Sequence, residues 1–149
     1  MIRRMDATDV EAVVALQQAW ALENITHGFA AATHQQVMEA MTPYCLVAEA
    51  DGKIVGYLMA ELHPNHDFCI YPSGASYLEV NDLYVQKGYR SRHIGRQLLA
   101  CCEELAGKNG VSHFLVSSAT KDAEAVRRFY QNQHYAIWTT TFYKKTDAD

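Results

Sequence analysis

The sequence predicts one α/β domain in which a β-sheet is covered by helices. The chain has 149 residues, of which 49% are hydrophobic and 20% are charged, as expected for a single globular domain over residues 1–149. Strand-like and helix-like segments alternate in the order strand, two helices, three strands, helix, strand, helix and strand. An Asp51-Gly52 turn between two apolar runs indicates that a β-hairpin is among them.

The first third of the chain is expected to form one strand and two helices. Ile2–Met5 reads as a short strand. Thr8 and Glu11 have the spacing of a capping box, so a first helix is expected to begin there. A second helix is expected from about residue 33 to residue 41, because Pro43 disfavours helical geometry in the residue before it.

The middle of the chain is rich in strand signals. Residues 45–50 and 53–60 are the two apolar runs of the expected hairpin. Residues 77–85 form a third strand-like run, in which the alternation of apolar and polar side chains slips by one residue at Asn81 and Asp82. Such a slip predicts a β-bulge at this point.

The last third is expected to alternate helices and strands. Apolar residues recur at helical spacing from Ile94 to Leu105, which predicts an amphipathic helix. Residues 111–117 read as a strand, residues 122–131 as a further helix, and residues 135–143 as a final β-rich segment.

Charge and composition argue against several classes of partner. The chain has 13 basic and 17 acidic residues, a formal charge of −4, which disfavours a nucleic-acid partner and favours a cationic small substrate. No apolar stretch approaches the roughly 20 residues that span a bilayer, so we expect no membrane partner and a cytoplasmic location. No metal is expected either, because the cysteines form no CxxC pair and because His63, His66 and Asp67 share one loop without a fourth ligand.

The stretch from Val85 to Leu99 carries the most information about function. A strand end passes through a turn containing Arg90, Arg92 and Arg96 into the amphipathic helix. Unpaired backbone N–H groups at a helix start, together with its positive dipole end, form a site for phosphate oxygens. From the residues alone, a turn with solvated arginines is an equal alternative. The stretch contains neither the P-loop motif nor the Gly-x-Gly-x-x-Gly motif of dinucleotide sites.

This stretch resembles the cofactor motif of the GNAT superfamily of acyl-CoA-dependent N-acetyltransferases, and the resemblance extends over nearly the whole chain. The motif Arg/Gln-x-x-Gly-x-Gly/Ala falls on residues 90–95, after the typical Leu83-Tyr84-Val85 and before the typical Gly-Arg-x-Leu-Leu. A second family motif resembles residues 122–135, where Phe129-Tyr130 match well. The resemblance implies a mixed, mostly antiparallel sheet of six to seven strands, flanked by about four helices and splayed at the cofactor site.

The resemblance implies acetyl-CoA as co-substrate. The turn would hold the pyrophosphate, and the pantetheine would pair with the strand before the turn. The implied cofactor-binding residues are Leu83, Tyr84, Val85, Arg90, Ser91, Arg92, His93, Ile94, Gly95, Arg96, Ser117, Ser118, Phe129 and Tyr130. The motif departs at two commonly glycine positions, which hold Ser91 and His93 here, and a Cβ restricts φ at such positions. We expect binding to be retained because the flanking pattern is intact.

Amine acetylation needs a base and, at the departing thiolate, an acid. The resemblance assigns the acid to Tyr130, although spacing alone favours a core tyrosine. An amine with a pKa of about 10.4 must lose a proton before it attacks. Glu79 is our first candidate for the base and Asp82 the second, since a bulge between them would turn both toward the acceptor. Either carboxylate could instead be an ordinary surface group.

The resulting hypothesis is an N-acetyltransferase that acetylates a primary amine of a small molecule by direct attack. An aminoglycoside, a polyamine or an amino-acid derivative would fit. The alternatives are a protein or peptide acceptor and a non-catalytic acyl-CoA sensor. We expect His27, His34 and the loop at residues 68–71 to line the acceptor pocket. A homodimer fits the resemblance, and homodimers are the commonest soluble assembly.

Overall fold

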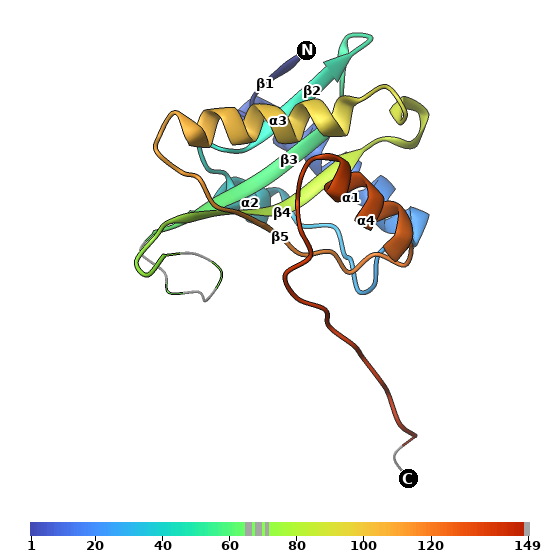
Figure 1. The fold of residues 1–149 in the computed structure, drawn as a ribbon. Helices are drawn as coiled ribbons and strands as arrows, with labels where there is room; N and C mark the ends of the chain where they lie inside the picture. The colour runs from blue at the N-terminus through green and yellow to red at the C-terminus, as the bar shows by residue number, and fades with distance from the viewer. Residues whose placement is uncertain (65–66, 68–69, 71, 148–149) are drawn as a thin grey trace.

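The computed structural model describes residues 1–64, 67, 70 and 72–147. Figure 1 shows one sheet with helices on both faces. In the described residues the strands are β1 (Ile2–Arg4), β2 (Leu46–Ala50), β3 (Lys53–His63), β4 (Tyr77–Val85) and β5 (Phe114–Val116). The helices are α1 (Val10–Glu23), α2 (His34–Ala40), α3 (Ile94–Gly107) and α4 (Ala123–Asn132), with short 3-10 turns at Ala7–Asp9 (η1) and Lys87–Tyr89 (η2).

The sheet has five strands in the order β1-β2-β3-β4-β5. Neighbouring strands from β1 to β4 are antiparallel, and β4 and β5 are parallel. The predicted α/β class and the mixed sheet are therefore confirmed, as are about four helices. The expectation of six to seven strands is wrong.

The missing strand is the final β-rich segment, residues 135–143. It leaves α4 and runs away from the sheet (Figure 1). The side chains of Phe142 and Tyr143 are 90% and 87% exposed. Its composition favours a strand, but a strand also needs a neighbouring backbone to satisfy its N–H and C=O groups. None of the five described strands pairs with it.

Two local predictions in the middle of the chain are confirmed. Asp51 and Gly52 both have positive φ, 52° and 73°, as the tight turn of the β2–β3 hairpin requires. In the β3–β4 ladder Met59 pairs with Asp82 and the next residue of β3 pairs with Val80, so Asn81 is the extra residue of a bulge.

The bulge determines which side chains of β4 face which helices. Before it, Val80 belongs to the core under α3, and after it Leu83 packs against that same core. Tyr84 belongs to the core on the opposite face, with residues of α1 and α2. Asp82 pairs with Met59 of that second core and thus lies on the same face as Tyr84.

The start of α1 differs from the predicted capping box. Asp6, not Thr8, caps the chain here: its side chain accepts from the backbone N–H of Thr8, and Asp9 accepts from the backbone N–H of Asp6. Arg3 donates from Nη1 and Nη2 to the two carboxylate oxygens of Asp9, both at 2.7 Å. This pair joins β1 to the beginning of α1, and a 3-10 turn therefore precedes the helix.

Candidate active site

The sheet opens between β4 and β5. These strands pair only through Leu78–Phe114, Glu79–Leu115 and Val80–Val116. Beyond Val80, β4 continues to Val85, whereas β5 ends at Val116. Residues 81–85 thus have β3 on one side and none of the described strands on the other. This is the splay that the resemblance implied.

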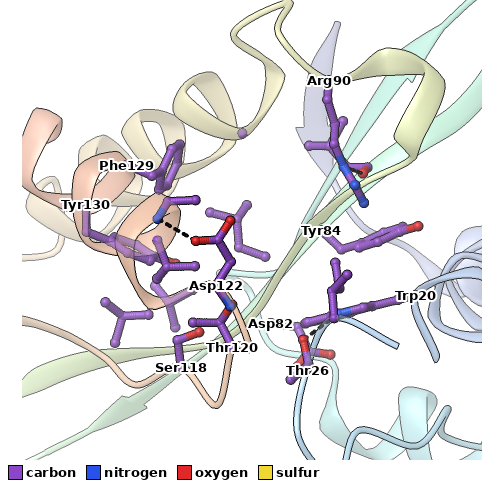
Figure 2. Close-up of a pocket in the computed structure, with 18 of the residues that line it drawn as sticks. Trp20, Thr26, Asp82, Tyr84, Arg90, Ser118, Thr120, Asp122, Phe129 and Tyr130 are labelled. Atoms are coloured by element: carbon purple, nitrogen blue, oxygen red, sulfur yellow. Dashed lines mark hydrogen bonds between the residues drawn. The ribbon is translucent and has the colours of Figure 1, made fainter. Parts of the chain in front are cut away.

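A cavity of about 1180 Å³ lies at this opening. Figure 2 shows Phe129 and Tyr130 on one side of it and Trp20, Tyr84 and Arg90 on the other. Its lining includes every residue that the resemblance assigned to the cofactor except Arg92. Ligand pockets typically hold about 300–1,000 Å³, so the space suits a large ligand.

The cavity reaches the start of α3 through a turn with unusual backbone geometry. Ser91 and His93 both have φ of 63°, in the left-handed region where glycine is free of strain. The turn thus keeps the backbone shape of the motif without its glycines. His93 is the N-cap, no side chain caps the helix, and its first turn holds no acidic residue. The His93 side chain is exposed and lines the cavity.

Arg90 is held in place by three hydrogen bonds. Its Nε donates to the carbonyl oxygen of Val85 at 2.9 Å, and its Nη1 and Nη2 donate to the two oxygens of Glu23 at 2.8 and 2.6 Å. Glu23 also accepts from the Tyr84 hydroxyl at 2.7 Å. Burial raises the pKa of Glu23, but the hydrogen bonds from Arg90 and Tyr84 outweigh it and leave that pKa below its ordinary value. A phosphate contact by Arg90 stays a prediction.

Of the two candidate bases, Asp82 is the one that lines the cavity. Its Oδ2 accepts from the Tyr57 hydroxyl at 3.1 Å and from Nε2 of Gln17 at 3.3 Å. Burial raises the pKa of Asp82, and the hydrogen bond from Tyr57 offsets part of that rise. Gln17 also accepts from the backbone N–H of Ala32 at 2.7 Å, so one buried side chain joins the carboxylate to the loop between α1 and α2.

Glu79, the first candidate for the base, lies elsewhere on β4. It shares a face with Asp82 because of the bulge, but it does not line the cavity. Its Oε2 is 3.0 Å from Nε2 of His63, with which it forms an ion pair when the histidine is protonated. Its role as a base stays a prediction.

Tyr130 lines the cavity from α4. Its ring meets those of Phe129 and Tyr135 edge to face, with centroids 5.0 and 5.5 Å away. Burial raises the pKa of Tyr130 to about 12, so the hydroxyl keeps its proton at neutral pH. A neutral phenol at this position can donate a proton.

Aromatic side chains build the wall of the cavity next to Asp82. Trp20 stacks on Phe29 with ring centroids 4.0 Å apart and on Tyr84 with centroids 5.3 Å apart. The Trp20 Nε1 donates to the Thr26 hydroxyl at 3.0 Å, which fixes the indole (Figure 2). We call Trp20, Phe29 and Tyr84 the aromatic wall.

The structure confirms only some of the other residues that we expected to line the acceptor pocket. His27 lines the cavity, whereas His34 is the first residue of α2 and does not. Phe68, Tyr71 and His66 lie outside the described residues. Among the residues that are described, no group of three His, Cys, Asp or Glu side chains could hold a metal ion. Nor does any helix there have the length and apolar character needed to cross a bilayer.

Sequence reasoning missed Glu23, Gln17 and Tyr57. Each acts on a residue that is distant in the chain: Arg90 is 67 positions from Glu23, and Asp82 is 65 from Gln17 and 25 from Tyr57. No local pattern marks such pairs.

A sheet that opens between two parallel strands, beside a helix start without a side-chain cap and a buried tyrosine, has the features that the resemblance to acyl-CoA-dependent acyltransferases implied. A family model described as the acetyltransferase (GNAT) family matches residues 10–135. The chain belongs to this family and is an acetyltransferase.

Solved structures share the fold at low sequence identity. Aminoglycoside acetyltransferase AAC(6')-Iy, solved with the bisubstrate analogue CoA-S-monomethyl-acetylneamine, is 20% identical, with a TM-score of 0.74 over 99% of this chain and 98% of that one. An aminoglycoside acetyltransferase from an uncultured soil metagenomic sample is 19% identical, with a TM-score of 0.72 over 99% and 96%. A ribosomal-protein-alanine N-acetyltransferase from Brucella melitensis biovar Abortus 2308 is 17% identical, with a TM-score of 0.71 over 98% and 99%. A search of curated proteins found no match.

Proposed function

We propose that this acetyltransferase moves the acetyl group of acetyl-CoA to a primary amine of a small molecule by direct attack. The observation that supports this most strongly is the cavity at the β4–β5 opening. Its lining combines side chains from both faces of the sheet: Asp82 lies on the α1 face and Tyr130 packs against the α3 core. A base and an acid could thus act on opposite sides of one reacting carbon.

The residues present fit coenzyme A. The unpaired N–H groups at the start of α3 would bind the diphosphate, and Arg96 adds positive charge at the cavity. The free side of β4 would bind the amides of the pantetheine as an added strand does. Because Arg90 already occupies the Val85 carbonyl, the pairing groups would be those of Leu83. When bound, acetyl-CoA supplies the activated acetyl group.

Asp82 would remove the proton from the acceptor amine. At neutral pH, freeing the lone pair of an amine with a pKa near 10.4 costs roughly 4–5 kcal/mol. A carboxylate whose pKa is raised by burial is a better base near neutral pH than an exposed one. Tyr57 and Gln17 hold Asp82 toward the cavity.

Tyr130 would protonate the departing thiolate. Its raised pKa of about 12 keeps the proton available at neutral pH. A CoA thiol has a reference pKa of about 8.5, which is below that of Tyr130. Transfer of the phenol proton to the sulfur therefore becomes favourable only as the carbon–sulfur bond breaks and the phenolate oxygen of Tyr130 is stabilised.

The aromatic wall and Asp82 together suit the acceptor. An ammonium group would meet the carboxylate, and the body of the molecule would lie against the rings of Phe29 and Tyr84. Aminoglycosides, polyamines and amino-acid derivatives remain the classes to test. Two of the similar structures are aminoglycoside acetyltransferases, which makes that class the first choice.

The experiment is a thiol-release assay with acetyl-CoA and a panel of amines, including a peptide with a free N-terminus. We expect turnover with a small amine, and Tyr130→Phe should reduce kcat by roughly 10²–10⁴-fold. Tyr135→Phe is the matched control, because the Tyr135 hydroxyl instead donates to Glu103. Turnover with the peptide alone would favour a protein acceptor. CoA binding without acetylation of any amine would overturn the proposal in favour of a sensor.

A further inference from the structure

The turn at residues 90–96 holds three arginines and one histidine, and these side chains divide into two groups. The first group is bound to the protein. Arg90 forms the bidentate pair with Glu23. Arg92 lies over the Tyr89 ring, 5.0 Å from its centroid, and it does not line the cavity. These two arginines therefore hold the turn against its neighbours.

His93 and Arg96 form the second group. Both side chains are exposed, and both line the cavity. Within the part of the chain that the structure describes, neither side chain forms a hydrogen bond or an ion pair. Because residues three positions apart at a helix start lie on the same side of its first turn, the imidazole and the guanidinium can reach one anion. Their donor groups are available to a ligand in the cavity.

The backbone at His93 has the shape of the motif but not its residue. Its φ and ψ are 63° and 12°, in the left-handed region that glycine adopts without strain. Such strain is often found at functional sites, because the surrounding structure holds the residue there. Strain alone does not distinguish His93, since His134 has φ of 67° and does not line the cavity. The combination of this backbone with a place in the cavity does distinguish it.

The ligand group that suits this pair is the diphosphate of coenzyme A, so the inference rests on the proposed use of acetyl-CoA. The start of α3 has no side-chain cap and therefore offers its first backbone N–H groups to an anion. A diphosphate diester is anionic throughout the neutral range. Histidine, by contrast, ordinarily gains its positive charge between about pH 8 and about pH 5.

We propose that the His93 side chain binds this diphosphate together with Arg96, and that it thereby makes the affinity for CoA depend on pH. A glycine at this position would offer only its backbone N–H. The imidazole adds a second donor, and in its protonated form both ring nitrogens donate and the ring carries a charge. CoA therefore binds more tightly on the mildly acidic side of neutrality.

The other charged and titratable groups around this turn do not bind the imidazole. They are Lys87 and Tyr89 of η2, Asp122 at the start of α4, and Asp82 and His27 across the cavity. Asp122 accepts from the backbone N–H of Ala125, and Asp82 accepts from Tyr57 and Gln17. Because His27 titrates in the same pH range, the test compares variants in which His27 is retained.

The test is the Kd for CoA by isothermal titration calorimetry at about pH 6 and about pH 8. His93→Asn removes the charge and tolerates the left-handed backbone. We expect it to raise Kd about tenfold at the lower pH and roughly twofold or less at the higher pH. His93→Gly should behave in the same way. His134→Gly is the matched control, because it relieves the same strain outside the cavity and should leave Kd unchanged.

Dephospho-CoA distinguishes the diphosphate from the 3′-phosphate, a monoester that itself titrates at about pH 6. The effect of His93→Asn should be the same with both ligands. An effect that disappears with dephospho-CoA would assign the imidazole to the 3′-phosphate and overturn the proposal. Equal affinities of the wild type and His93→Asn at the lower pH, or equal losses at both pH values, would also overturn it.

Calorimetry separates this inference from the proposed function. A wild type that binds CoA while His93→Asn binds equally well would contradict the role of His93 and leave the proposed acetylation intact. A wild type that binds no CoA at either pH would overturn both. Neither result depends on finding the acceptor amine.

Discussion

Arg90 and Glu23 form a bidentate ion pair that joins the turn before α3 to the last residue of α1. The pair connects the expected cofactor end of the cavity with the helix that carries the acceptor side. Arg90 also holds the Val85 carbonyl, so its guanidinium shapes the turn from both sides. We therefore propose that it is a positioning residue.

Substituting either partner should therefore have the same effect. We expect Glu23→Gln and Arg90→Gln each to raise KM for acetyl-CoA about tenfold. This factor corresponds to the loss of roughly one charge-assisted hydrogen bond. The double variant should be little worse than either single variant, because both remove one interaction. Steady-state kinetics on the three variants measure this, with Glu11→Gln as a control on the exposed part of α1. A much larger effect of Arg90→Gln alone would indicate a direct phosphate contact.

The pH dependence of the reaction should follow Asp82. Because burial raises its pKa, the active carboxylate is lost as the pH falls through a value above the ordinary aspartate range. Tyr57→Phe removes a hydrogen bond that lowers this pKa, so the acid limb of kcat/KM should move to higher pH.

The control for this profile is Tyr44→Phe, a buried tyrosine of the opposite core whose hydroxyl accepts from Asn109. It should leave the acid limb in place. Asp82→Asn should lower kcat/KM by roughly 10²–10⁴-fold and abolish the limb. An unchanged limb in both Tyr57→Phe and Asp82→Asn would assign the titration to another group, with Glu79 the next to test.

His93→Gly should stabilise the protein. A residue with a Cβ at φ of 63° carries backbone strain of about 1 kcal/mol that glycine does not. For a chain of this size, that gain raises Tm by roughly 2–4 °C, which calorimetry detects. His34→Gly, at the first position of α2 with ordinary helical geometry, should lower Tm instead. A lower Tm for His93→Gly would show that the imidazole itself contributes to stability.

The Arg3–Asp9 pair should make the free energy of unfolding depend on pH in the acid range. The hydrogen bond from Arg3 lowers the pKa of Asp9, so the carboxylate contributes stability above its ordinary pKa and loses it as the pH falls through the lowered value. Asp9→Asn should reduce the free energy of unfolding at neutral pH by about 2 kcal/mol, less than for a fully buried pair because Arg3 is partly exposed.

Urea unfolding at neutral pH and near pH 3 checks this, and the gap between wild type and Asp9→Asn should narrow in acid. Glu39→Gln, an exposed change on α2, should show no such narrowing. A gap that stays constant with pH would mean that the charge of Asp9 is unimportant.

Local signals in the sequence predicted most of the fold. The Asp51-Gly52 turn and the slip at Asn81 each depend on neighbours within a few residues, and both are confirmed. The strand predicted at residues 135–143 failed for the opposite reason, because composition indicates a preference for extended backbone but does not supply a partner. The left-handed backbone at His93 was indicated only by the motif, in which this position is commonly glycine.

The site was predictable only where a contiguous motif marks it. The turn at residues 90–96 and the Phe129-Tyr130 pair resembled known motifs, and nearly all of them line the cavity. Spacing alone could not show which of Glu79 and Asp82 lines the cavity. That outcome depends on burial and on the hydrogen bonds from Tyr57 and Gln17, which arise only once α1 and β3 pack against β4.

The bulge at Asn81 determines which side chains of β4 face the cavity. If residues 80–82 formed a regular strand with all three residues retained, Asn81 would pair with Met59 and Asp82 would turn toward the α3 core. The bulge, and not the residue types of β4 alone, therefore sets the side of the sheet that the Asp82 carboxylate faces.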